Sequence, residues 1–178
     1  QAQAWPIALD KKDMISVAKT GSGKTCAYLL PAIHELLTNK EQSSSGKISV
    51  FILAPTRELC LQIMTEVTKY TGQNNTPQSN SFAPRDSRNR RKVYQKSQRN
   101  NNGGTNQSDT GINALACYGG SDRMRQIRAL KHDNIQILVG TPGRCNDLME
   151  AGALDLRNVK YCVLDEADRM YVLFLYVF

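Results

Sequence analysis

Residues 18–25 combine glycines, one lysine and one hydroxyl in the pattern of a phosphate-binding loop. They read Ala-Lys-Thr-Gly-Ser-Gly-Lys-Thr, which is G-x-x-x-x-G-K-[ST] with alanine in place of the first glycine. Gly21 and Gly23 allow a tight turn whose amides approach anionic oxygens, and a helix starting near Lys24 adds the positive end of its dipole. We expect Lys24 to reach the β- and γ-phosphates of a nucleotide and the Thr25 hydroxyl to ligate Mg²⁺. An ordinary glycine-rich turn is the alternative.

A second group of residues, Asp165-Glu166-Ala167-Asp168, supplies carboxylates directly after the apolar run 161–164. Open α/β sheets bind ligands beyond the carboxyl ends of their strands, so we expect Asp165 to hold the hydration shell of Mg²⁺. Glu166 is placed to orient or deprotonate an attacking water. Together with Lys24, these two carboxylates are the candidate catalytic residues. The alternative is that the acidic residues only cap a following helix.

The elements that must position these residues alternate along the chain. Apolar runs predict strands at 13–18, 48–53, 114–118, 135–140 and 160–164, and helix-prone segments predict helices at 24–37, 57–70, 122–132 and 144–150. This alternation predicts an α/β fold with a mostly parallel sheet and helices on both faces.

Two of the predicted helices carry further expectations. Pro31 should kink the first helix or end it early, because proline lacks the backbone N–H and clashes with the preceding turn. In the helix at 122–132, Ile127 and Leu130 continue an apolar face. We expect its solvated side to be formed by Arg123, Arg125, Arg128 and Lys131.

Five segments together resemble the motifs of DEAD-box RNA helicases, in their order and with roughly their spacing. They are 18–25, 55–59 (Pro-Thr-Arg-Glu-Leu), 119–120 (Gly-Gly), 141–144 (Thr-Pro-Gly-Arg) and 165–168. The alanine at the start of the loop is the usual form in that family, and Gln1 resembles its adenine-reading glutamine. The resemblance implies a RecA-like P-loop NTPase domain that uses ATP and Mg²⁺. Its nucleotide-binding residues would be Gln1, Ala18, Lys19, Thr20, Gly21, Ser22, Gly23, Lys24 and Thr25.

The same resemblance implies a path for single-stranded or duplex RNA, contacted through its backbone. Glycines allow close approach, threonine hydroxyls and helix N-termini bind phosphates, and arginines add positive charge. Read without the family, each segment is equally an ordinary connector between a strand and a helix. The implied RNA-binding residues are Pro55, Thr56, Arg57, Gly119, Gly120, Thr141, Pro142, Gly143 and Arg144.

Composition limits the remaining possibilities. The chain has 178 residues, 40% hydrophobic content and a mean hydropathy of −0.44, which predicts one soluble domain at most. It shows no apolar run of membrane-spanning length and no secretion signal. Its five cysteines form no C-x-x-C pair, so we expect free thiols, mostly in the core, in a reducing intracellular compartment, and assign none to a metal.

Residues 72–112 differ from the rest in composition. Seven basic and two acidic side chains there contribute +5 to the net charge of +7, and apolar periodicity is almost absent. We predict a disordered insertion. Its cluster at 88–92 offers phosphate contacts that would tether RNA, and the alternative is a solvated loop without a dedicated role. The predicted domain thus comprises 1–71 and 113–170.

The end of the chain departs from the family. Relatives continue from Met170 to a strand that ends in Ser-Ala-Thr, whereas residues 171–178 form an apolar, β-prone tail. We therefore expect a first domain that is incomplete at its C-terminus, and an aberrant, aggregation-prone tail. The arginine that a second RecA-like domain supplies in the family would be missing, which predicts very slow ATP hydrolysis.

The predicted function is that of the ATP- and RNA-binding first domain of an ATP-dependent RNA helicase. Two alternatives stay open: a non-catalytic RNA- or partner-binding fragment, and a P-loop NTPase of another class.

Overall fold

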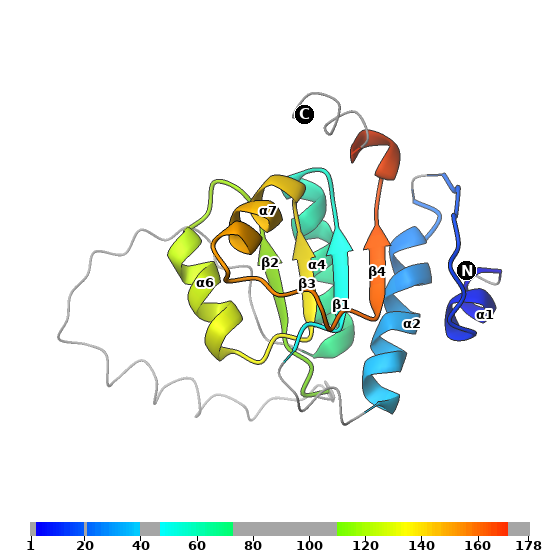
Figure 1. Cartoon of the computed structure of the whole chain (residues 1–178). Helices are drawn as coiled ribbons and strands as arrows, with labels where there is room; N and C mark the ends of the chain where they lie inside the picture. The colour runs from blue at the N-terminus through cyan, green and yellow to red at the C-terminus, as the bar shows by residue number, and fades with distance from the viewer. Residues whose placement is uncertain (1–2, 20, 40–46, 73–109, 171–178) are drawn as a thin grey trace, which may run out of the picture.

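Four parallel strands form one sheet at the centre of the molecule. The computed structural model describes residues 3–19, 21–39, 47–72 and 110–170. The strand order is β2-β3-β1-β4, as Figure 1 shows. The strands are β1 (Val50–Leu53), β2 (Ala114–Cys117), β3 (Ile137–Gly140) and β4 (Tyr161–Leu164). The predicted α/β class with a parallel sheet is confirmed, and all four carboxyl ends lie at one edge, which we call the carboxyl edge.

Helices cover both faces of this sheet (Figure 1). On one face lie α2 (Lys24–Thr38) and α4 (Arg57–Thr71), and on the other lie α6 (Arg123–His132) and α7 (Pro142–Glu150). A short helix, α1 (Ala4–Leu9), packs beside α2, and Lys11 Nζ lies 2.9 Å from Glu35 Oε1 there. The helix boundaries match the sequence prediction within two residues, except for α1, which was not predicted.

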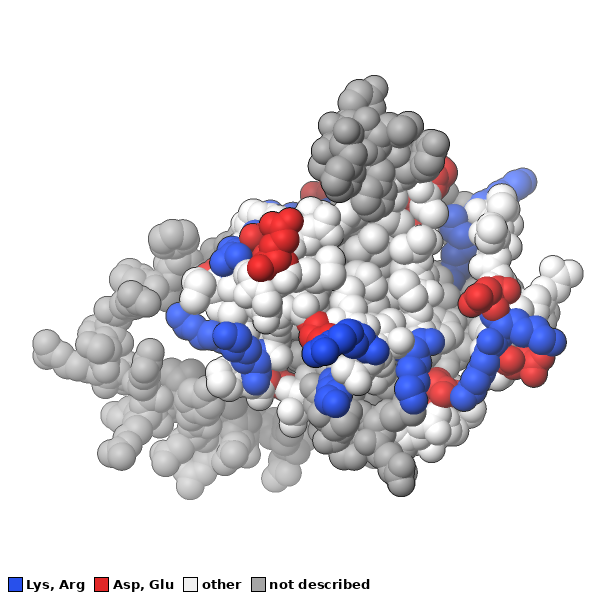
Figure 2. Space-filling model, in the orientation of Figure 1, with Lys and Arg blue, Asp and Glu red and all other residues white. Residues whose placement is uncertain are grey.

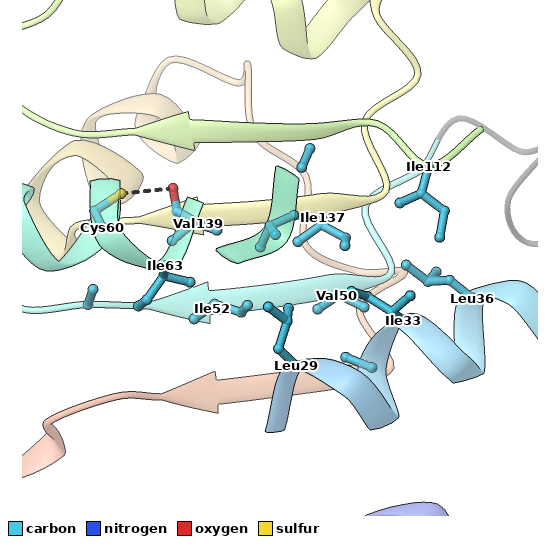
Figure 3. Close-up of a cluster of buried hydrophobic side chains, with 14 residues drawn as sticks. Leu29, Ile33, Leu36, Val50, Ile52, Cys60, Ile63, Ile112, Ile137 and Val139 are labelled. Atoms are coloured by element: carbon cyan, nitrogen blue, oxygen red, sulfur yellow. Dashed lines mark hydrogen bonds between the residues drawn. The ribbon is translucent and has the colours of Figure 1, made fainter. Parts of the chain in front are cut away.

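Strand side chains alternate between two apolar clusters. Figure 3 shows the cluster beneath α2 and α4, where Val50, Ile52, Ile137 and Val139 meet helix side chains such as Leu29 and Ile63. In the same cluster the Cys60 thiol donates to the Val139 carbonyl oxygen at 3.4 Å. Residues of the opposite parity pack beneath α6 and α7; they include Phe51, Leu138 and Cys117. This double burial fixes the strand ends that carry the site.

The predicted strand at 13–18 does not form. Residues 13–19 have no regular secondary structure, and Ile15 and Val17 are 98% and 96% exposed. Within the described residues β4 pairs with β1 alone, and Leu164 on β4 is 57% exposed. A strand needs a neighbour to pair its backbone groups, and no described strand lies beyond β4 to provide one. The apolar residues of 13–18 were therefore not enough to predict a strand there.

Of the two outcomes predicted for Pro31, a kink or an early end of its helix, the early end does not occur. The helix α2 runs for 15 residues and contains Pro31 in its interior. Pro31 is buried, and Leu29, Ile33 and Leu36 on either side of it pack into the core. Burial of that apolar stripe outweighs the lost hydrogen bond, which illustrates how tertiary packing overrides a local breaker.

On α6 the prediction for Ile127 and Leu130 is confirmed, since both pack against the second cluster. Arg125, Arg128 and Lys131 are exposed as expected. Arg123 differs, because its guanidinium pairs with Asp147 of α7 at 2.9 Å and is partly buried.

The base of the predicted insertion is closed by threonines. The amide and the hydroxyl of Thr110 donate to the Thr71 carbonyl oxygen at 3.3 and 2.8 Å. Gly72 ends α4 in the left-handed conformation, with φ 73°. Residues 73–109, and with them the predictions of disorder and of an RNA tether, lie outside the described residues, as do Gln1, Thr20 and the tail 171–178. In the described part of the chain, no helix combines the length and apolarity needed to span a membrane.

Candidate functional site

The phosphate-binding loop leads into α2, as the sequence predicts. The helix starts at Lys24, preceded by Gly23 in the left-handed conformation with φ 82°, and Gly21 has φ 79°. The Ser22 amide donates to the Lys19 carbonyl oxygen at 3.2 Å. Only glycine adopts such φ values at low cost, so both glycines are needed for the turn. Figure 1 shows that the start of α2 lies at the same end of the sheet as the carboxyl edge.

The acidic motif lies beside this helix. Asp165 directly follows β4, and its amide donates to the Leu53 carbonyl oxygen at 3.0 Å. The Tyr28 hydroxyl of α2 donates to Asp165 Oδ2 at 2.9 Å across a sequence separation of 137 residues. The same hydroxyl interacts with the Thr25 side chain. The structure thus brings Thr25 and Asp165, the two predicted magnesium ligands, to one tyrosine.

Tyr28 is a site residue that sequence analysis did not identify. Burial, and then the negative charge of Asp165, raise the pKa of its hydroxyl above the ordinary value. It therefore stays protonated and acts as a donor throughout the physiological pH range. One sequence signal exists in retrospect: Tyr28 follows Thr25 by three residues, and residues spaced this way lie on the same helix face.

Glu166, the predicted water-orienting residue, occupies an unusual backbone position. Its φ is 53°, in the left-handed region that few residues other than glycine adopt. Its carboxylate is partly buried and lies 3.1 Å from Arg169 Nη1. The Glu166 carboxylate is thus held by Arg169 three residues further along the chain. To orient a water, this carboxylate must share or leave that ion pair.

The three predicted RNA-binding segments all lie on the carboxyl edge. Residues 55–57 follow β1, residues 119–120 follow β2 and residues 141–144 follow β3. Given the strand order, the edge reads Gly-Gly, then Thr-Pro-Gly-Arg, then Pro-Thr-Arg, and finally the acidic motif after β4. Residues scattered over more than a hundred positions therefore form one continuous row of loops.

Arg57 joins two of these loops. Its guanidinium carbon lies 5.0 Å from the centre of the Tyr118 ring, a distance typical of a cation–π contact. A Cβ placed on Gly120 would come within 3.5 Å of Arg57 Nη1, and Gly120 has φ 75°. Thr56 caps α4, because its hydroxyl oxygen accepts from the Leu59 amide at 3.2 Å. Thr56, Arg57, Gly119 and Gly120 are exposed, whereas Pro55 is buried.

Arg144 lies in an internal network. Its side chain is 12% exposed, and its Nη1 donates to Gln126 Oε1 at 2.7 Å. Buried Gln126 in turn donates to Ser121 Oγ at 2.6 Å and to the Tyr118 carbonyl oxygen at 3.4 Å. The amide of Gln126 thus ties the glycine loop to α7. Sequence analysis did not identify Gln126. The only signal in the sequence was a polar residue next to the apolar positions Ile127 and Leu130 of α6.

An ion pair between α6 and α7 lies next to this network, and we call the two together the α6–α7 corner. Arg123 Nε donates to both carboxylate oxygens of Asp147, at 2.9 and 3.1 Å, and Arg144 Nε lies 3.6 Å from Asp147 Oδ2. The hydrogen bond from Arg123 lowers the pKa of the Asp147 carboxyl, so this group stays ionised near neutral pH. The arginines of this corner therefore serve the structure of the loops.

Charge does not gather densely at the carboxyl edge on the visible face. Figure 2 shows Lys and Arg side chains in a discontinuous row across the lower part of this face and a few more toward its upper left and upper right, and Figure 1, in the same orientation, places the strand carboxyl ends at the top.

Comparisons with known proteins place this geometry in context. The model of the DEAD/DEAH box helicase family matches residues 1–175. The chain is 40% identical over 170 residues to the probable ATP-dependent RNA helicase ddx17 of Dictyostelium discoideum, covering 96% of the chain but 17% of that relative. It is 36% identical over 171 residues to the human probable ATP-dependent RNA helicase DDX43, covering 20% of its length.

Solved structures agree in fold. The yeast DEAD-box splicing factor Prp28 superimposes with a TM-score of 0.63 at 30% identity, over 90% of this chain and 30% of that one. A hypothetical ATP-dependent RNA helicase from Sulfolobus tokodaii gives 0.62 at 26% identity, over 98% of this chain and 38% of that one. These neighbours confirm the predicted RecA-like fold. With its family model matched almost from end to end, the chain belongs to the DEAD/DEAH box helicase family.

Proposed function

We propose that this chain binds ATP and RNA as the first domain of an ATP-dependent RNA helicase. One observation carries the proposal: the phosphate-loop helix and the acidic motif meet at Tyr28, at the end of the edge formed by the other motif loops. The names of the relatives, ATP-dependent RNA helicases, support this assignment. Coupling of ATP hydrolysis to RNA unwinding or remodelling belongs, in this proposal, to the whole protein.

Nucleotide binding would use the loop and the start of α2. Helix N-terminal amides lack intrahelical partners, so those that follow Gly23 suit phosphate oxygens. Lys24 would add its charge at the β- and γ-phosphates. Of the remaining predicted contacts, Ala18, Lys19, Gly21 and Ser22 are exposed around the turn.

Thr25 and Asp165 suit a magnesium ion. A hydroxyl and a carboxylate are the hard oxygen donors that Mg²⁺ prefers, and here both interact with the Tyr28 hydroxyl. When bound, Mg²⁺ would neutralise phosphate charge and polarise the phosphoryl group. Glu166 would hold the attacking water and accept its proton, with Arg169 keeping its carboxylate in place beforehand.

RNA would follow the loops after β1, β3 and β2. Exposed Thr56, Gly119, Gly120 and Gly143 present hydroxyl or backbone groups, and exposed Arg57 presents a charge held over Tyr118. Such groups recognise the sugar-phosphate backbone, which predicts little sequence preference. Arg144 would contribute mainly by holding the glycine loop.

A second candidate, a non-catalytic RNA- or partner-binding fragment, is favoured by one observation. The segment before the phosphate loop is not part of the sheet, with Ile15 and Val17 almost fully exposed. Among the described residues no strand precedes the phosphate loop, so α2 alone joins it to the core, and fixing the loop on binding costs free energy.

Binding of a fluorescent ADP to the chain, followed by anisotropy, separates the two candidates. The parent should bind in the presence of Mg²⁺, and Lys24→Ala should bind about tenfold or more weakly, since it loses a charge-assisted hydrogen bond to phosphate. Lys12→Ala is the matched control, because Lys12 is exposed and pairs with Asp10 outside the site. Equal binding by all three, or none by the parent, would favour the non-catalytic fragment.

A further inference from the structure

We infer that the Tyr28 hydroxyl is a positioning group that holds the Asp165 carboxylate in the orientation in which it binds a divalent cation together with Thr25. The inference rests on the proposed nucleotide function and deepens it. It assigns a role to a residue outside the phosphate-loop and acidic motifs.

The sheet fixes the Asp165 backbone but leaves its side chain undetermined. The amide is held by the Leu53 carbonyl oxygen at 3.0 Å, as a continuation of the β1–β4 pairing. Among the described residues, the only side-chain hydrogen bond to the Asp165 carboxylate comes from Tyr28, at 2.9 Å to Oδ2. Because β4 has no described neighbour on its other side, nothing else from the sheet limits the rotation of this carboxylate.

Tyr28 is itself firmly held. It lies on the second turn of α2, one residue before fully buried Leu29, and its ring packs against the cluster beneath α2 and α4. The ring therefore has a packing role that phenylalanine would fill equally well. The Tyr28 hydroxyl adds something that phenylalanine would lack, because it interacts with the side chains of both predicted cation ligands.

This arrangement has the form of an outer-shell contact at a metal site. A donor on one carboxylate oxygen fixes the side-chain orientation and leaves the other oxygen for the cation. The competing explanation is that Asp165 merely satisfies a partly buried hydroxyl. The two differ in one measurable respect, because only the positioning role affects the affinity for a cation.

The test uses Mn²⁺ as a paramagnetic substitute for Mg²⁺, with the full chain of 178 residues and saturating ADP. Free Mn²⁺ is measured by electron paramagnetic resonance in the parent and in Tyr28→Phe. We expect the Mn²⁺ Kd of Tyr28→Phe to rise about tenfold, the lower end of the effect of losing an outer-shell partner. ADP affinity measured without divalent cations should be unchanged.

Tyr70→Phe is the matched control. The Tyr70 hydroxyl also contacts α2, at 3.2 Å from Cys26 Sγ, but it does not touch Asp165. Its removal should leave the Mn²⁺ Kd unchanged. Equal Mn²⁺ affinity in the parent and Tyr28→Phe would overturn the inference while leaving the proposed function intact. A parent that binds neither ADP nor Mn²⁺ would remove the proposed function, and the inference with it.

A second comparison separates positioning from damage to the fold. In an Asp165→Asn background the carboxylate is gone, so adding Tyr28→Phe should not weaken Mn²⁺ binding further. Additive losses in the double variant would mean that Tyr28→Phe acts through the fold, and would also overturn the inference.

Discussion

At the scale of single residues, the polar network around Arg144 shows how an internal contact can shape an exposed loop. Arg144 is surrounded by Gln126, the Ser121 carbonyl oxygen and Asp147, and Gln126 is itself 6% exposed. The network binds the carbonyl oxygens of Tyr118 and Ser121, on either side of exposed Gly119 and Gly120, and so holds the glycine loop from its buried side. Its integrity should therefore be visible in stability as well as in binding.

Replacing Gln126 by leucine should lower the free energy of unfolding by about 1–3 kcal/mol, because Arg144 and Ser121 lose a buried partner. Chemical denaturation measures this. Gln62→Leu is the matched control, since Gln62 is exposed on α4, and it should change stability by less than about 0.5 kcal/mol. Equal stability of the two variants would show that the network contributes nothing.

Three buried thiols predict a specific dependence of stability on pH. Burial raises the pKa of Cys60 and Cys145 to about 12, and it raises that of Cys117 as well. The ordinary pKa of a cysteine thiol, 9.0, applies to the unfolded chain, so well below pH 9 these thiols are neutral in both states. As the pH rises from 9 toward 12, only the unfolded thiols ionise, and each lowers the free energy of unfolding by about 1.4 kcal/mol per pH unit.

Urea denaturation at pH 8, 9 and 10 tests this expectation. Cys145→Ala should show a shallower decline than the parent, because one of the contributing thiols is gone. An identical decline in both proteins would assign the pH dependence to other groups.

At the scale of elements, the two ends of the predicted insertion are joined by hydrogen bonds, an arrangement we call the closed junction. Thr71 and Thr110 join the end of α4 to the segment before β2 through two hydrogen bonds. Replacing 73–109 by a short Gly-Ser linker should therefore preserve the fold and raise the free energy of unfolding by at most about 2 kcal/mol, since each halving of a loop gains about 0.6 kcal/mol.

Thermal unfolding and RNA affinity at low salt are the two measurements for this variant. We expect an unchanged RNA affinity, in keeping with a solvated loop that has no dedicated role. A marked drop would instead assign a tethering role to the basic residues of the insertion. Loss of cooperative unfolding would contradict the closed junction.

Helix positions were predictable because residues at or next to the helix ends determine where a helix begins and ends. Thr56 and Asp122 cap α4 and α6 through their side chains, and Gly72 ends α4. Strands were predictable where an apolar run also finds a neighbouring strand, as in β3, whose four residues are all buried between β2 and β1. The segment 13–18 has the same apolar character but no strand beside it in the described structure. Its fate depends on a pairing partner, which periodicity does not reveal.

The candidate site was predictable in part for a similar reason. Its loops were identified because glycines, threonines and carboxylates at strand ends carry recognisable chemistry. Tyr28 and Gln126 were not, because each is defined by contacts with residues distant in sequence or in another element. The internal role of Arg144 escaped prediction likewise, since the sequence does not show whether an arginine in the first turn of a helix faces solvent or Gln126.

At the scale of the whole molecule, one edge of the RecA-like sheet carries the segments 55–57, 119–120, 141–144 and 165–168, and the start of α2 lies at the same end. The chain spans 17% of the length of its Dictyostelium relative, so activity of the complete protein stays a proposal. The division into a domain of 1–71 and 113–170 with an insertion between them also stays a prediction. What the described structure supplies is the order of the segments along that edge, with Asp165, a predicted cation ligand, directly after β4.

Amide chemical-shift mapping by nuclear magnetic resonance tests this account most directly, with ADP·Mg²⁺ and a short poly(U) RNA added in turn to the full chain. We predict that ADP·Mg²⁺ shifts the amides of Gly21–Thr25 and Asp165. The RNA should shift Thr56, Gly120 and Gly143, which lie on three separate segments at the carboxyl edge, after β1, β2 and β3. Shifts confined to the opposite end of the sheet, or a complete lack of shifts with both ligands, would contradict the assignment of this edge to ATP and RNA.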